Sequence, residues 1–338
     1  MGADQGLGER STATHIRTMT TRDEVLEFYR THYDVLGQWR LQPGQKVVLG
    51  DKKGPSTCRF CGRSKPEVTF RKVAHAIPEL LGNKSIETAY ECDPCNQAFG
   101  SGIENDLGNW SKPMRTLARI RGKNGVPTLK RGADGQGWRI EYDNTSGFKI
   151  MSYEKNPFYT VDEAAKKINF NLARDPYTPV AVLKAFMKIG LTLLPPEEID
   201  NFKHALLWIR DTDHSIPFAD QCPIMYHFQP GPIPTDVVTA SVFRRKPEVK
   251  NQAYCYLALS YGNEAFQVQI PSKEHDGSHQ TYAIHPYPPP GSPDPARFGP
   301  PGRTLLDMTD RSLRRGETVP VSCGFLASVR VLGPKEGA

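Results

Sequence analysis

Four cysteines in the N-terminal half of the chain are spaced like the ligands of a metal ion. They form two Cys-x-x-Cys pairs, Cys58 with Cys61 and Cys92 with Cys95, which are separated by residues 62–91. Four thiolates can close a tetrahedral shell around one zinc ion, at roughly 2.3 Å each. Two disulfides are the alternative, and the reducing conditions of a cytoplasm disfavour them. The pattern therefore predicts a structural zinc site.

One histidine lies between the two cysteine pairs, in the stretch FRKVAHAIPELLGN. Hydrolysis of a phosphodiester needs a group that takes a proton from water, and histidine titrates near neutral pH in its unperturbed state. A histidine in a zinc module can equally be a spare ligand or a packed core residue. From its type and position alone, His75 is a candidate general base whose structural interpretation stays open.

The surrounding stretches, FRKVAHAIPELLGNKS and ECDPCNQAFGSGIENDL, resemble the four-cysteine branch of the HNH endonucleases, also called ββα-metal nucleases. The resemblance lies in a His-x-x-Pro strand end, a Leu-Gly-Asn loop and a Cys-x-x-Cys-Asn that opens a helix. It covers roughly residues 55–110. The N-terminal half also resembles the nuclease half of HNH effectors in bacterial anti-phage systems, in which a separate C-terminal domain senses a signal. Residues 151–338 show no comparable resemblance.

The resemblance implies a metal-dependent endonuclease that hydrolyses DNA, acting in anti-phage defence or restriction. It implies that His75 is the general base, that Asn83 orients it by hydrogen bonding, and that Asn96 holds a catalytic divalent ion, Mg²⁺ or Mn²⁺. From the residues alone, Asn96 could instead be a helix N-cap. Gly82-Asn83 could equally form a simple turn.

One position departs from the family pattern. Many HNH enzymes place an acid directly before the histidine as a second metal ligand, and this chain has Ala74 there. Substrate phosphate, water, or another acid such as Glu104 or Glu91 would then complete the shell of the catalytic ion. Magnesium keeps several water ligands readily, so a thin protein shell is chemically sufficient.

The net charge of +6 is distributed unevenly along the chain. Two basic runs, at residues 52–72 and 111–131, flank the cysteine segment, and a phosphate backbone is the natural partner for such a field. Solvated surface charge is the alternative. The candidate DNA contacts are Arg71, Lys72, Arg115, Arg119 and Arg121. Of these, Arg115, Arg119 and Arg121 are expected to share one face of a β stretch.

Secondary-structure patterns divide the rest of the chain. A capping box at Thr21 and Glu24 opens an amphipathic helix expected over residues 20–39. Turn signals split residues 116–151 into a hairpin-rich β segment. Thr178-Pro179 and then Glu197-Glu198 predict two successive helices, separated by a double proline.

The C-terminal third changes to period-two patterns from Pro223 onward, which predicts strands. A turn at YGN separates two of these strands, and eight prolines in residues 283–303 predict a loop or cover. Cys222, Cys255 and Cys323 follow no ligand spacing and are expected to be ordinary buried thiols.

These patterns together predict an α+β protein with an N-terminal ββα-metal nuclease module and a C-terminal domain that contains a helical hairpin and a β-rich sheet. We expect a helical extension at 1–50, the zinc-bound module at 51–130, and an α+β domain at 131–338. The C-terminal domain could sense a small-molecule activator, bind a protein partner or a second copy of the chain, or contact DNA.

Other function classes remain open or are disfavoured. No stretch approaches the apolar length of a membrane span, and the first twenty residues lack the apolar region of a secretory signal, so a cytoplasmic protein is expected. A non-catalytic zinc-knuckle protein that binds nucleic acid is the main alternative to the nuclease. A zinc-stabilised protein-interaction module is the third possibility.

Overall fold

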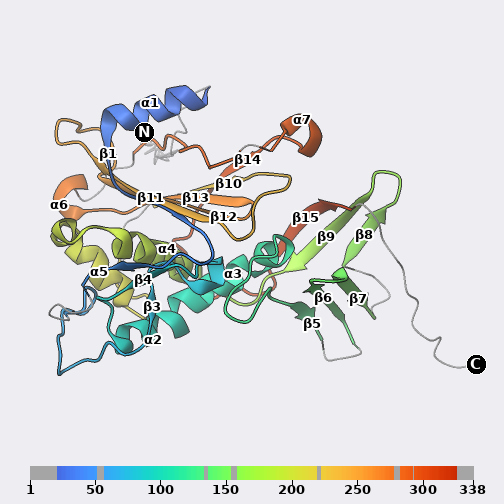
Figure 1. The fold of residues 1–338 in the computed structure, drawn as a ribbon, viewed down its shortest axis with the longest axis horizontal. Helices are drawn as coiled ribbons and strands as arrows, with labels where there is room; N and C mark the ends of the chain where they lie inside the picture. Colours follow the sequence, from blue (N-terminus) through green and yellow to red (C-terminus); the bar gives the residue numbers. More distant parts are fainter. Residues whose placement is uncertain are drawn as a thin grey trace, which may run out of the picture.

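The computed structural model describes residues 21–51, 57–132, 136–153, 158–218, 222–277, 282–291 and 293–325. Its largest element is a six-stranded antiparallel sheet with helices on both faces (Figure 1). The cysteine segment packs below this sheet, and two smaller sheets lie to one side. The predicted mixed α and β composition is confirmed.

The large sheet has the strand order β1-β11-β12-β13-β10-β14, and every pair is antiparallel. Its β12 and β13 form a hairpin through Gly262-Asn263, at the turn that the sequence predicts. The predicted β-rich character of the C-terminal third is therefore confirmed. The strands are β1 (Tyr33–Leu41), β10 (Ile224–Phe228), β11 (Val238–Arg245), β12 (Cys255–Tyr261), β13 (Glu264–Gln269) and β14 (Gly302–Leu306).

The predicted pair of successive helices is confirmed. Helix α4 (Pro179–Leu193) lies between the large sheet and the cysteine segment, and all of its residues are buried. A Cβ atom at Gly190 would lie 2.2 Å from Cδ1 of Ile270, so glycine lets α4 approach the sheet closely. After the double proline come a 3₁₀ helix, η2 (Pro196–Phe202), and α5 (Lys203–Arg210).

The helix predicted over residues 20–39 is correct only in its first half. Helix α1 (Arg22–His32) carries the predicted capping box at Thr21, but Tyr33–Leu41 forms strand β1 at the edge of the large sheet. Pairing with β11 supplies backbone partners that outweigh the local helical pattern. Helix α1 covers the sheet face opposite α4.

The domain boundaries at 50 and 130 stay predictions, and the described residues of the three ranges share one hydrophobic core. A continuous cluster of buried side chains contains Leu41, Leu107 and Leu257, one from each range. The predicted N-terminal extension also contributes an edge strand to the C-terminal sheet. Its first twenty residues lie outside the described residues.

The cysteine segment folds as two short strands and a helix, as the ββα prediction requires. Strand β3 (Ala74–His75) pairs antiparallel with β4 (Ile86–Thr88), and α2 (Asp93–Ser101) follows. Strand β2 (Val47–Leu49) pairs parallel with β4 on its other side. The segment also contains the 3₁₀ turn η1 (Glu79–Leu81), after β3, and the longer helix α3 (Ile103–Leu117), after α2.

Two small sheets complete the described structure. The hairpin-rich segment expected at 116–151 forms β5, β6 and β7, although its first two residues belong to α3. No helix in the described ranges combines the length and apolar character needed to cross a membrane. The remaining elements are β5 (Leu129–Arg131), β6 (Trp138–Asp143), β7 (Gly147–Ser152), β8 (Tyr159–Asp162), β9 (Lys167–Ala173), α6 (Lys273–Asp276), α7 (Pro295–Phe298) and β15 (Thr318–Gly324).

Candidate active site and metal centre

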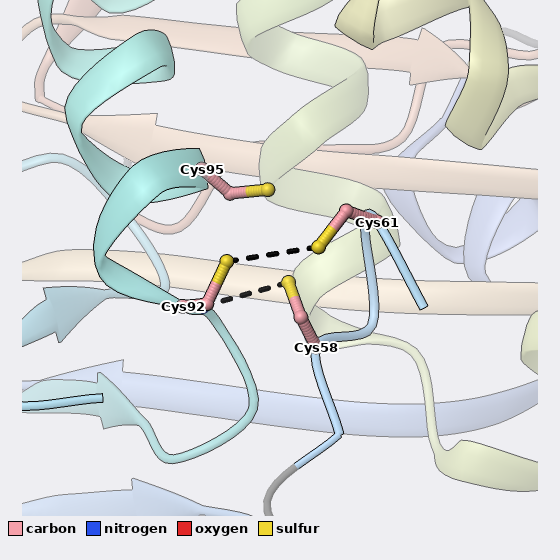
Figure 2. Close-up of side chains that lie close together, drawn as sticks. All are labelled: Cys58, Cys61, Cys92 and Cys95. Carbon is pink, nitrogen blue, oxygen red and sulfur yellow. Dashed lines mark hydrogen bonds between the residues drawn. The ribbon is translucent and has the colours of Figure 1, made fainter. Parts of the chain in front are cut away.

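The two cysteine pairs converge on one point, as their spacing predicts. All four sulfur atoms lie within 4.8 Å of one another, and the sulfurs of Cys61 and Cys92 are 3.7 Å apart (Figure 2). A tetrahedron with metal–sulfur bonds of roughly 2.3 Å has edges of about 3.8 Å, so these separations suit a zinc ion. The cluster could hold such a metal with sulfur ligands alone.

The electrostatics of the cluster favour one thiolate even without a metal. A hydrogen bond from the Cys95 thiol lowers the pKa of Cys58 to about 4, despite burial, and the backbone N–H of Cys92 donates to the same sulfur at 3.5 Å. Burial raises the pKa of Cys92 to about 12. A metal ion bound by all four sulfurs would have to displace the remaining thiol protons, so its binding would depend on pH.

Cysteines outside the cluster fit the prediction of ordinary thiols. Cys222 and Cys255 are buried, Cys323 is half-buried, and all three are free. Burial raises the pKa of each thiol, which keeps it neutral and unreactive.

His75 lies on β3, next to the cluster in the ββα arrangement. Its side chain is 21% exposed, and its Nε2 lies 3.6 Å from a carboxylate oxygen of Glu79. Its Nδ1 is buried and has no hydrogen-bond partner among the described residues. Neither ring nitrogen therefore makes a close hydrogen bond to the described residues, and Nε2 has only the longer contact with Glu79.

Asn83 is fully buried and uses its whole amide group to close the loop after β3. Its Nδ2 donates to the carbonyl oxygens of Ile77 (2.6 Å) and Ile86 (3.1 Å), and its Oδ1 accepts from the N–H groups of Ser85 and Ile86. These bonds join the ends of β3 and β4. The described hydrogen bonds of Asn83 do not include the ring of His75, so the predicted orienting contact is not among them.

Asn96 lies in the first turns of α2, four residues after the N-cap residue Cys92. Its Nδ2 donates to the carbonyl oxygen of Val73 at 3.3 Å, which places the start of α2 beside the strand that contains His75. The side chain is half-buried, and its Oδ1 is the atom that could ligate a cation. Among the residues predicted for catalysis, Asn96 is therefore held against the chain segment that leads into His75.

Residues 58–110 match the HNH endonuclease family. The matched range contains all four cysteines, His75, Asn83 and Asn96, and it ends before the second basic run. Searches of curated proteins and of solved structures find no match to the chain. The ββα segment with its cysteine cluster is therefore similar to an HNH endonuclease domain, and residues 58–110 are called the HNH module below.

The two acids considered as further metal ligands both contact a buried lysine. Lys188 of α4 lies 3.0 Å from Oε2 of Glu91 and 3.0 Å from Oε1 of Glu104. Burial raises the pKa of Glu91 to about 7, although the adjacent Lys188 opposes this rise. In this structure Glu104 therefore neutralises an ammonium group inside the HNH module.

A basic loop lies against the start of α2. The Asp93 carboxylate accepts from the backbone N–H groups of Arg71 and Lys72 at 2.9–3.1 Å and from the hydroxyl of Thr69. The Lys72 ammonium donates to Oε1 of Gln97 at 3.3 Å. Arg71 and Lys72 are exposed, so the loop presents two positive charges next to Asn96.

The three arginines of the second basic run do not share a face of a β stretch, and this prediction is wrong. Arg115 belongs to α3 and is buried, and its guanidinium donates to the carbonyl oxygens of Leu80 and Gly108. Helix α3 contains Pro113 and ends at Leu117, so it extends past residue 116, where the β segment was expected to begin. Arg115 is thus committed to hydrogen bonds inside the protein.

The other two arginines face solvent. Arg119 and Arg121 are exposed and line a cavity of about 510 Å³, together with Lys84 and Asp236. Arg121 also hydrogen-bonds Oδ1 of Asn144. The cavity adjoins the loop that Asn83 closes, so this part of the basic run remains available to a phosphate group.

Sequence reasoning missed three residues near the site: Glu79, Asp93 and Lys188. Asp93 could have been found from the sequence, because an acid in the first turn of a helix accepts hydrogen bonds from free backbone N–H groups. Lys188 offered one too, since a charged residue inside the apolar run VAVLKAFMKIGLTL must find a buried partner. Glu79 lies four residues after His75 but is not in the same helix, so its approach to His75 depends on the chain reversal between β3 and η1.

Proposed function

We propose that this protein is a metal-dependent HNH endonuclease that hydrolyses DNA phosphodiester bonds, with His75 as the general base. The observation on which the proposal rests is the contact between Asn96 and the backbone of Val73, two residues before His75. This contact supports the proposal because it holds the candidate ion ligand against the chain segment that leads into the candidate base, within the matched residues.

In the proposed reaction, His75 takes a proton from a water molecule while the water oxygen attacks phosphorus. The new P–O bond forms as the bond to the leaving oxygen breaks, and the leaving oxygen then takes a proton from solvent. A divalent ion, when bound, neutralises negative charge at the leaving oxygen. The His75 side chain is 21% exposed, which is compatible with access of water from one side.

Asn96 is our proposed protein ligand for that ion, through Oδ1, with phosphate and water as the other ligands. We leave Glu104 out of the ligand set because it pairs with Lys188. The four cysteines would hold a structural zinc ion. A full sulfur shell leaves no position for water, so this zinc would stabilise the fold and would not catalyse.

Plasmid cleavage by the purified full chain, with Mg²⁺ or Mn²⁺ added, tests the proposal. His75→Ala should lower the cleavage rate by at least ~10²-fold, the usual contribution of a positioned base, without loss of DNA binding. Asn96→Ala should raise the metal concentration required. His32→Ala, on α1 across the large sheet, is the matched control and should cut normally.

A chain that binds DNA but shows no metal-dependent cleavage would instead be a non-catalytic zinc-knuckle protein. A chain without salt-dependent DNA binding would favour an interaction module. A role in anti-phage defence or restriction, a small-molecule activator, a protein partner, a homo-oligomer and a cytoplasmic location all stay predictions from the sequence.

A further inference from the structure

The side chain of Lys188 lies inside the HNH module although the residue belongs to α4, in the C-terminal part of the chain. It is fully buried, and its Nζ lies 3.0 Å from a carboxylate oxygen of Glu91 and 3.0 Å from one of Glu104. The same Nζ lies 3.4 Å from the backbone carbonyl oxygen of His75, to which it donates. One ammonium group thus links α4 to three separate pieces of the module.

The energetics of burial hold this ammonium group at one position. A buried charge is costly unless opposite charges and hydrogen bonds compensate it. The other near neighbours are aromatic: the ring centres of Phe99 and Phe60 lie 5.7 Å and 5.9 Å from Nζ. The contacts of Nζ with both carboxylates and the His75 carbonyl oxygen compensate its buried charge, so these groups are held in place with it.

The ring of His75, by contrast, is largely buried but makes no close hydrogen bond among the described residues. Its Nε2 is 3.6 Å from Glu79, which is longer than a normal hydrogen bond, and its Nδ1 has no partner among the described residues. Strand β3 is only two residues long. Because no close hydrogen bond fixes the ring, the position of the His75 backbone contributes directly to its orientation.

We propose that Lys188 is a positioning residue of the nuclease site, which holds the His75 backbone through its carbonyl oxygen and so aims the imidazole. The proposal rests on the proposed role of His75 as general base. It also means that residues 51–130 do not form the complete site, because α4 supplies one of its supports. A proton-accepting group must be held within a fraction of an ångström of its productive geometry.

Substitution of Lys188 by methionine in the full-length chain tests the proposal. Methionine removes the positive charge and retains an unbranched side chain. We expect kcat for plasmid cleavage to fall by about 10- to 100-fold, the effect of a small misplacement of a catalytic group. KM and the affinity for uncleaved DNA should stay within about twofold of the wild-type values, because Lys188 contacts no solvent-exposed surface.

Helix α4 offers a matched control in Lys184, one turn before Lys188. Lys184 is also buried, but its Nζ donates to the backbone carbonyl oxygen of Asp211 at 2.5 Å, outside the HNH module. Lys184→Met should therefore cost stability as Lys188→Met does. It should leave kcat, corrected for the folded fraction, at the wild-type value.

A second readout follows the His75 ring directly and does not depend on cleavage. The imidazole signals of His75 can be assigned by NMR from their loss in His75→Ala. They should shift in Lys188→Met and stay unchanged in Lys184→Met. If Lys188→Met does not fold, Lys188→Arg replaces it: arginine keeps both ion pairs but cannot place one nitrogen at the same point. This variant should shift the same signals, whereas Lys184→Arg should not.

These readouts separate failure of the two proposals. Equal cleavage by wild type and His75→Ala would refute the general base and leave the NMR comparison as the test of positioning. Unshifted His75 signals in the folded Lys188 variant would overturn the positioning role, whatever the activity. So would equal losses of corrected kcat in the Lys188 and Lys184 variants.

Discussion

The guanidinium of Arg59 stacks on the ring of Tyr90, 3.8 Å from its centre, and both side chains hydrogen-bond the C-terminal end of α4. Arg59 donates to the carbonyl oxygens of Leu191, Thr192 and Leu194 at 2.7–2.9 Å, and the Tyr90 hydroxyl donates to that of Thr192. A cation at this end also interacts favourably with the helix dipole. The first cysteine knuckle therefore caps a helix of the C-terminal part of the chain.

Replacing Arg59 by alanine should destabilise the whole protein. Three carbonyl oxygens would lose a charged donor in a partly buried site, so we expect a loss of about 2–3 kcal/mol in the free energy of unfolding. Urea unfolding followed by circular dichroism measures it. Arg30→Ala, which removes an exposed arginine from α1, should change little. Equal stability of Arg59→Ala and wild type would contradict the capping role.

Metal analysis of the purified chain should find one zinc ion per molecule. Cys58→Ser or Cys92→Ser should lose the ion and give misfolded or insoluble protein, because metal binding and folding are coupled in such sites. Cys323→Ser, at a thiol outside the cluster, should keep both zinc and fold. Soluble, active protein without zinc would refute the structural role of the ion.

DNA affinity should depend on the exposed arginines of the second basic run. Reversing Arg119 and Arg121 to glutamate should weaken binding at least ~10-fold at low salt and reduce the slope of log affinity against log salt by about 2. Fluorescence anisotropy with a labelled duplex measures both. The control replaces exposed Lys167 and Lys203 by glutamate, which changes the net charge equally. An equal loss of DNA affinity in the control would indicate only a general effect of net charge.

The stability of the protein should fall in mild acid partly through His227. Burial, with a smaller effect from Arg303, lowers the pKa of His227 to about 4, below its usual 6.5. The unfolded chain therefore binds more protons than the folded one between these values, so this residue contributes stability above pH 6.5 that is lost as the pH falls towards 4.

His227→Gln should remove that dependence. Between pH 7 and pH 5, the variant should lose about 2 kcal/mol less unfolding free energy than the wild type. Urea unfolding at the two pH values measures the difference. His275→Gln, at an exposed histidine, should retain the wild-type dependence. If the two variants lose stability equally between these pH values, His227 is not the responsible group.

Local spacing in the sequence was sufficient for much of the HNH module. The Cys-x-x-Cys pairs each form one knuckle, and the order of His75, Asn83 and Cys95-Asn96 matches a strand, a loop and a helix. These are short-range relations, which backbone geometry and ligand chemistry determine within a few residues. The capping box at Thr21 and the helix at Pro179 were predictable for the same reason.

Tertiary structure alone decided what depends on distant parts of the chain. Tyr33–Leu41 is a strand because β11 pairs with it, and Arg115 is buried because α3 packs over the loop at Leu80. Lys188 reaches the backbone of His75 across 113 positions of sequence. Neither residue type nor periodicity encodes such a contact, since it arises only when α4 fills the space between the large sheet and the HNH module.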